Sequence, residues 1–153
     1  GLENLTQLTR LELFDNQLTS VSGLENLIKL DKLSLDGNKL TEVPKGLEKL
    51  AQLTDLGLGG NQLTSVSGLE KLIKLTSLGL GGNKLTDIKG LEKLAKLERL
   101  YLYSNKLTDV KGLEKLAKLK RLNLERNPDL TKAQIAELQK ALPDCEIEHN
   151  AKQ

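Results

Sequence analysis

The chain has 153 residues, of which 38% are hydrophobic, but its only aromatic side chains are those of Phe14, Tyr101 and Tyr103. Its 23 basic and 21 acidic residues are interleaved and give a net charge of +2, which argues against strong phosphate-driven binding to nucleic acid. No apolar run approaches the roughly 20 residues that span a bilayer, so no membrane insertion is expected. The length fits one domain, residues 1–153, and a core of Leu without large aromatics suggests small identical layers stacked side by side.

Residues 1–7 are interpreted as a partial N-terminal repeat, because the string GLENL occurs at both 1–5 and 23–27. The first strand, expected near residues 10–13, would then be an open edge of a sheet. Open edges pair with other chains unless they are guarded, so self-association through this end is expected. No signal-peptide pattern is visible. The compartment is not determined, but a cytoplasmic or recombinant origin is favoured.

Residues 8–127 are built from repeats of 22 or 23 residues with the pattern L-x-x-L-x-L-x-x-N-x-L. The first copy contains Leu8, Leu11, Leu13, Asn16 and Leu18. Each copy continues through T-x-[VI] to a G-L-E-x-L segment. The one extra residue falls near Pro44, where a turn can accommodate it.

Each repeat predicts a strand followed by a return path. The L-x-L alternation predicts a short strand with Leu inward and the x residues outward. Parallel strands need a crossover, and the i, i+3 spacing of G-L-E-x-L-x-x-L predicts one or two helical turns there. Strands stack about 4.8 Å apart while helical turns need more width, so the stack should bend with the sheet on its concave side.

The Asn of each repeat is predicted to be structural. A turn off the strand leaves inward-facing backbone N–H and C=O groups without ladder partners, and a buried Asn amide can bind both kinds. The six positions are Asn16, Asn38, Asn61, Asn83, Asn105 and Asn127.

Residues 128–153 are predicted to form a C-terminal cap. Thr131 and Gln134 have the spacing of a capping box, and Ile135, Leu138 and Leu142 form an apolar stripe that would cover the last repeat. Pro143 should end the helix, and the residues from Cys145 should form a final short strand, with Cys145 as a small core residue.

This pattern resembles the leucine-rich-repeat family, and the 22-residue length with its G-L-E-x-L tail is most similar to the bacterial internalin-like class. The resemblance covers essentially the whole chain. It implies an α/β solenoid: a curved right-handed superhelix with a concave parallel β-sheet, short helical or 3-10 segments on the convex side and the C-terminal helix-plus-strand cap. It also implies a non-catalytic module that binds a protein or peptide on the concave face.

The outward strand positions supply the candidate ligand-binding residues: Phe14, Lys32, Asp36, Asp55, Arg99, Tyr101, Tyr103 and Arg121. Exposed aromatics are rigid anchors that favour interfaces, and four glycines between them would leave a bare trough for a partner backbone. The opposing interpretation is a scaffold face without a selected ligand, since such positions tolerate many residues and Tyr and Phe are good strand formers. Both interpretations remain open.

Two further observations bear on function. Residues 17–30 and 62–75 differ at one position, as do 84–97 and 106–119, so an engineered or idealised repeat scaffold is the alternative to a natural binding module. One His, one Cys, no phosphate loop and no clustered metal ligands predict no enzyme, no metal and no cofactor. The convex Glu positions, mostly followed by Lys, suggest a charged and solvated face.

Overall fold

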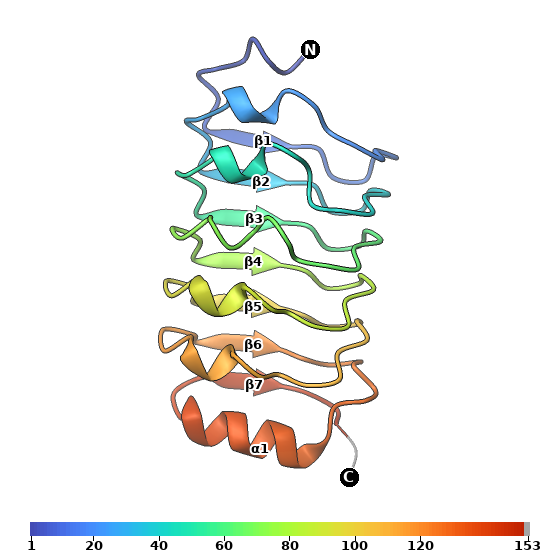
Figure 1. The fold of residues 1–153 in the computed structure, drawn as a ribbon, viewed down its shortest axis with the longest axis vertical. Coiled ribbons are helices and arrows are strands. Elements are labelled where there is room, and N and C mark those ends of the chain that lie inside the picture. The colour runs from blue at the N-terminus through green and yellow to red at the C-terminus, as the bar shows by residue number, and fades with distance from the viewer. Residues whose placement is uncertain (152–153) are drawn as a thin grey trace.

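The computed structural model describes residues 1–151, so the last two residues of the predicted cap lie outside the described part. Seven parallel strands form one sheet in sequential order (Figure 1). Each strand has three residues, at the L-x-L segments predicted from the repeat: β1 (Arg10–Glu12), β2 (Lys32–Ser34), β3 (Asp55–Gly57), β4 (Ser77–Gly79), β5 (Arg99–Tyr101), β6 (Arg121–Asn123) and β7 (Glu146–Glu148).

The register keeps equivalent residues of successive repeats side by side. Leu11 of β1 lies opposite Leu33 of β2, and Leu33 lies opposite Leu56 of β3, although the second step is one residue longer. The extra residue is therefore absorbed in the return path around the buried Pro44, as predicted. The sheet stays in phase despite the insertion.

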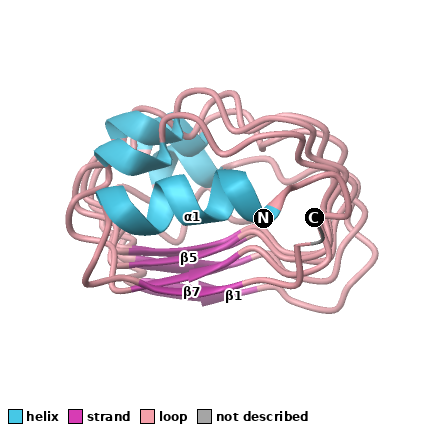
Figure 2. Cartoon of the chain, turned by 90° about the horizontal axis from the view of Figure 1, so that it is seen from below, coloured by secondary structure: helices cyan, strands magenta, loops and turns pink. Residues whose placement is uncertain are grey.

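Single 3-10 turns form the opposite side of the solenoid: η1 (Leu24–Asn26), η2 (Leu47–Lys49), η3 (Leu91–Lys93) and η4 (Leu113–Lys115). Figure 2 shows these turns and the sheet on opposite sides of the chain. In the third full repeat the same segment is a plain turn, closed by the Leu72 N–H donating to the Leu69 carbonyl at 3.0 Å. The helical turns that the G-L-E-x-L spacing predicted are thus confirmed as the short 3-10 kind.

Leucine layers fill the space between the sheet and the 3-10 turns. Leu35 and Leu58 have no exposed surface, and Leu47 and Leu69 from the opposite side are equally buried. The first layer is less complete, because Leu8, Leu11 and Leu13 are only partly buried. Each interior layer is covered by its two neighbours, so apolar burial along the stack stabilises the fold.

The C-terminal cap consists of α1 (Lys132–Ala141) and β7. The Thr131 Oγ1 accepts the Gln134 N–H at 3.2 Å, and the Gln134 Oε1 accepts the Thr131 N–H at 2.9 Å. These reciprocal bonds confirm the predicted capping box. Ile135, Leu138 and Leu142 are buried against the last repeat, and β7 pairs with β6, as the sequence indicated.

The described part of the chain, residues 1–151, contains no helix long and apolar enough to cross a bilayer.

Candidate functional site

The outer face of the sheet carries three columns of side chains. The first column is formed by the residue that precedes the central Leu of each strand. The second column is formed by the residue that follows this Leu, and the register keeps both columns aligned. The third column follows two residues later and contains Phe14, Asp36, Gly59, Gly81, Tyr103 and Glu125. A groove of about 670 Å³ runs over this face from β1 to β6.

Five of the eight predicted ligand-binding residues line this groove: Lys32, Asp36, Asp55, Tyr101 and Tyr103. Phe14, Arg99 and Arg121 lie outside its lining. Phe14 follows β1 at the first repeat and is 51% exposed, so it stands at the end of the face and apart from the tyrosines. Ser34 and Asn123 also line the groove, and their column positions were the signal that could have added them.

Tyr103 lies over Gly81, the residue at the same position of the preceding repeat. A Cβ placed at Gly81 would overlap the Tyr103 ring atoms Cε1, Cε2 and Cζ. Gly81 is buried while Tyr103 keeps 41% of its surface exposed. Because Gly81 has no side chain, one face of the Tyr103 ring packs against the backbone at Gly81 and the other face is exposed to the groove.

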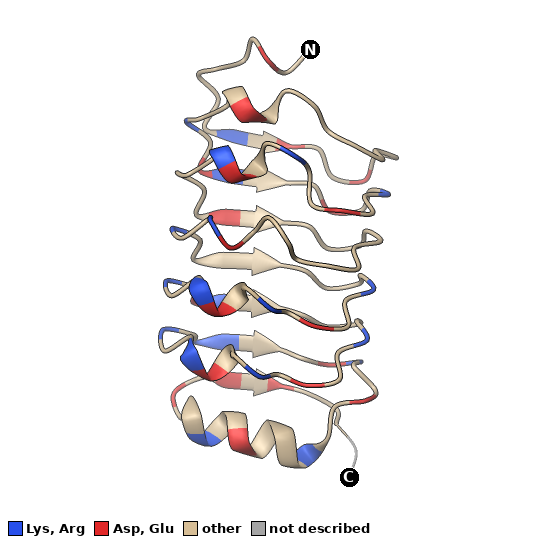
Figure 3. Cartoon of the chain, viewed as in Figure 1, with Lys and Arg blue, Asp and Glu red and all other residues tan. Residues whose placement is uncertain are grey.

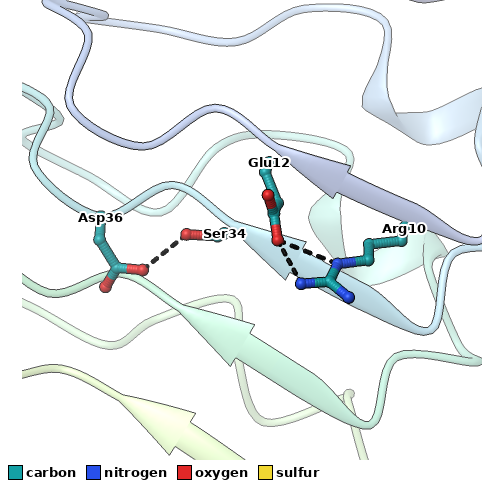
Figure 4. A network of polar contacts seen from close by, with 4 residues as sticks. All are labelled: Arg10, Glu12, Ser34 and Asp36. Atoms are coloured by element: carbon teal, nitrogen blue, oxygen red, sulfur yellow. Dashed lines mark hydrogen bonds and ion pairs between the residues drawn. The ribbon is translucent and has the colours of Figure 1, made fainter.

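At the other end of the groove, the side chain of Asp36 lies over glycines of the following repeat, as Tyr103 lies over Gly81. Its Oδ1 accepts the Gly59 N–H at 2.8 Å, and its Oδ2 accepts the Ser34 hydroxyl at 2.8 Å (Figure 4). A Cβ at Gly57 would overlap the same carboxylate. The charge is thus fixed over two glycines and held by two donors.

These contacts correct the expectation of a bare trough. Gly57 and Gly59 are covered by Asp36, and Gly81 is covered by Tyr103, because side chains from the neighbouring repeats fill the space that the missing Cβ atoms leave. Only Gly79 has an open position, where a Cβ would be 3.9 Å from its nearest neighbour, the Gly57 Cα. The open floor is one residue wide, with a fixed carboxylate on one side and a tyrosine pair on the other.

The arginines of the first column differ in their partners. Arg121 points toward the cap, with its Nη2 3.6 Å from Glu146 and its Nε 4.0 Å from Glu148. Arg10 donates through its Nε to Glu12 at 2.9 Å (Figure 4). Arg99 lies beside Arg121 in the register and has no ion-pair partner within residues 1–151. Of the two arginines predicted to contact a ligand, Arg99 is the one whose charge is free.

The repeat asparagines bind the backbone of two repeats. Asn61 donates through its Nδ2 to the carbonyls of Leu35 at 3.1 Å, Leu58 at 3.0 Å and Gly59 at 3.2 Å. Its Oδ1 accepts the Leu40 N–H at 3.0 Å. The same set of contacts recurs at Asn38, Asn83, Asn105 and Asn127. Each amide therefore ties one turn to the preceding repeat.

Asn16 departs from this pattern. It is exposed and donates only within its own repeat, to the carbonyls of Leu13 at 3.0 Å and Phe14 at 3.2 Å. The residue 20 or 21 positions earlier, whose N–H the other asparagines accept, would precede Gly1. Asn16, the first residue of the predicted ladder, thus makes hydrogen bonds within its own repeat and none to a preceding repeat.

Cys145 is buried in the core, as expected. Burial, and then the neighbouring Glu146 carboxylate, raise the pKa of its thiol, which suppresses the nucleophilic thiolate. Within residues 1–151, no three His, Cys, Asp or Glu side chains gather into a group that could hold a metal ion.

A right-handed solenoid with a parallel sheet on one side, 3-10 turns on the other and an Asn ladder between them is the fold of leucine-rich-repeat proteins. The family model described as Leucine rich repeat matches residues 28–85 and 73–128, and one described as Leucine Rich repeats (2 copies) matches residues 6–49. The chain therefore belongs to the leucine-rich-repeat family, which confirms the resemblance drawn from the motif.

Three similar solved structures come from bacteria. An internalin from Listeria monocytogenes superposes with a TM-score of 0.90 and 30% identity over 99% of this chain and 44% of its own. A leucine-rich-repeat protein from Leptospira interrogans has a TM-score of 0.88 and 35% identity over 95% of this chain and 38% of its own. A second Listeria internalin has a TM-score of 0.89 and 30% identity over 100% and 67%. The chain thus spans less than half the length of the first two. No curated protein sequence matched it.

Proposed function

We propose that this chain is a non-catalytic protein- or peptide-binding module that uses the concave face of its sheet. The observation that carries the proposal is the placement of Tyr103 on Gly81. The ring is fixed on one side by backbone and open on the other, so it can contact a ligand without a large loss of conformational entropy.

The chemistry of the face fits a peptide ligand. Tyr101 and Tyr103 supply apolar contact and hydroxyl groups, and the uncompensated Arg99 beside them supplies a donor for an acidic group. At the other end of the groove, Asp36 is held in place as an acceptor for a basic group. Gly79 leaves room between them for a ligand backbone.

Membership of the leucine-rich-repeat family and the superposition on two internalins support a role in protein interaction. Because fold alone does not identify a ligand, the proposal rests on the residues of the face and names only the class of partner.

The second candidate is an idealised repeat scaffold with no selected ligand. It is favoured by the near-identity of residues 17–30 with 62–75 and of 84–97 with 106–119. The contacts of Asp36 and Tyr103 with glycines argue for the binding module, because they form only where unlike side chains meet across repeats.

The experiment is a pull-down from lysates with three baits. The first is the protein itself, and the second carries Phe14→Ala, Tyr101→Ala and Tyr103→Ala. The third carries Lys39→Ala, Lys84→Ala and Lys106→Ala, which are exposed and outside the groove lining. A partner held by the first and third baits and lost by the second supports the concave site. A partner held equally by all three, or no partner from several lysates, contradicts it.

A further inference from the structure

One side of the solenoid carries a line of exposed apolar residues between two columns of lysines. The line is formed by the residue after each turn-closing Leu: Ile28, Ala51, Ile73, Ala95 and Ala117. Ile28 is 58% and Ile73 is 60% exposed, more than any other large apolar side chain described. In Figure 3 the basic segments recur from repeat to repeat along the same side.

The lysines flank this line in sequence and in space. One column precedes the apolar residue by two positions, at Lys49, Lys71, Lys93 and Lys115, and the other follows it directly, at Lys29, Lys74, Lys96 and Lys118. All eight are exposed. Within residues 1–151, none of their ammonium groups lies within 4.0 Å of a carboxylate. The Lys29 Nζ donates to Gln7 at 2.6 Å and the Lys74 Nζ to Gln52 at 3.0 Å, so side chains at this position reach the equivalent position of the preceding repeat.

The glutamates next to these lysines are engaged elsewhere. The Glu70 carboxylate accepts the Gly68 N–H at 2.9 Å, and the Glu92 carboxylate accepts the Gly90 N–H at 2.8 Å. Glu48 and Glu114 make the same bond to the glycine two residues before them. These carboxylates turn back onto the backbone, and the eight lysines outnumber the five glutamates of the turns, Glu25, Glu48, Glu70, Glu92 and Glu114, so the net charge of this side is positive. The charged, solvated face that the sequence suggested thus has an excess of positive charge.

We infer that this surface, here called the lysine flank, binds an acidic amphipathic α-helix lying parallel to the stack axis. An α-helix rises about 5.4 Å per turn. Adjacent parallel strands lie about 4.8 Å apart, which is close to this rise, so one helical turn approximately matches one repeat. Apolar residues of such a helix would lie along the Ile and Ala line, with Ala51 between Ile28 and Ile73 giving space for a larger side chain.

Acidic residues on both edges of the helix would then meet a lysine at four of the five repeats in each column, with Asn26 and Gln52 at the remaining places. The apolar line favours this occupant over a uniform polyanion such as nucleic acid. Two isoleucines separated by an alanine offer little apolar surface for insertion into a bilayer, so a helix is also favoured over a lipid surface. The lysine flank is distinct from the groove on the sheet, and this inference does not depend on the function proposed for that groove.

The test uses a labelled synthetic peptide of about four helical turns, held helical by a side-chain link, with leucines in one stripe and glutamates on both sides of it. Binding to the full chain is measured by fluorescence anisotropy. The flank variant carries Lys71→Glu, Lys74→Glu and Lys96→Glu. The charge-matched control carries Lys39→Glu, Lys84→Glu and Lys106→Glu, which are also exposed. A second pair of substitutions, Ile28→Ser and Ile73→Ser, removes the large apolar groups.

The flank variant is expected to bind at least about tenfold more weakly and the control within about twofold of the unchanged chain, because exposed charge pairs act only at short range. Loss of the two isoleucines should also weaken binding, and Tyr101→Ala with Tyr103→Ala should leave it unchanged. Absence of peptide binding, or equal losses in flank variant and control, would overturn the inference. So would unchanged binding of a peptide with serines in place of its leucines, or binding to phosphatidylserine vesicles in preference to the peptide.

Discussion

Tyr103 and Gly81 occupy the same position in successive repeats, and the tyrosine ring lies where a side chain at Gly81 would be. The pair shows how one repeat of a nearly uniform array can carry a large side chain on the sheet face. A large residue in one copy is accommodated by the absence of a side chain in the copy before it.

Replacing Gly81 with Ala should therefore displace Tyr103. We expect a loss of about 1–3 kcal/mol in the free energy of unfolding, from overpacking at a buried position. Urea denaturation measures it. The double variant Gly81→Ala with Tyr103→Ala should recover most of this stability, because the new Cβ at position 81 no longer overlaps a tyrosine ring. Tyr103→Ala alone should change the free energy of unfolding little. Gly79→Ala is the control, since a Cβ there has space. Additive losses in the double variant would mean that the two residues do not interact.

Asn61 and Asn16 should differ in their contribution to stability. Asn61→Ala leaves the buried Leu40 N–H without a partner and removes one of the two amide donors to each of the Leu35 and Leu58 carbonyls, at a cost of about 1–3 kcal/mol. Asn16→Ala removes two bonds at an exposed site, where water can replace them, and should cost clearly less. Chemical denaturation of the two variants provides the comparison. Equal losses would show that the bonds between repeats add nothing.

The stability should fall in acid partly through Glu70 and Glu92. Hydrogen bonds from their own backbone N–H groups, and then from Gly68 and Gly90, hold the pKa of both carboxyls below the ordinary value of 4.5. As the pH falls, these carboxyls therefore bind protons in the unfolded chain before they do so in the folded chain. Their contribution to the free energy of unfolding is fully present above pH 4.5 and is lost as the pH falls through the folded pKa. Glu70→Gln with Glu92→Gln should flatten the dependence of the melting temperature on pH below about 4.5.

The matched control for this titration is Glu42→Gln with Glu137→Gln. Both are exposed, and neither carboxylate accepts a backbone hydrogen bond within residues 1–151. If the two double variants showed the same acid profile, the backbone bonds of Glu70 and Glu92 would have no role in the pH dependence.

In the described structure β1 pairs only with β2, and we propose that the 153-residue chain self-associates through the other edge of this strand. The N–H groups of Leu13 and Asp15 donate to β2, so those of the even-numbered residues face away from it. Sedimentation velocity should show oligomers that increase with concentration, because an unpaired strand edge recruits another strand. Glu12→Pro removes one donor of the free edge and should reduce them. A chain that stays monomeric at high concentration would contradict this prediction.

The fold followed from the sequence because its determinants are local and periodic. The L-x-L segments became strands at the expected residues, and the Thr131–Gln134 spacing became a capping box, since both depend on side chains a few positions apart. The site was predicted less completely. The position of Asp36 depends on Gly57 and Gly59 in the next repeat, and Arg121 turns toward Glu146 in the cap. Contacts between residues 20 or more positions apart are decided by packing and rotamers, which the repeat pattern does not contain.

The central claim, binding on the concave face, is tested most directly at Gly79. Its Cβ position is open, so Gly79→Arg should fill the groove floor without disturbing the fold. Thr64→Arg, at an exposed position outside the groove, is the matched control. Titration calorimetry with the partner retained in the pull-down should show binding to the Thr64→Arg chain and a loss of at least about tenfold for Gly79→Arg, or about 1.4 kcal/mol. Equal affinity for both variants would place the partner elsewhere and contradict the account.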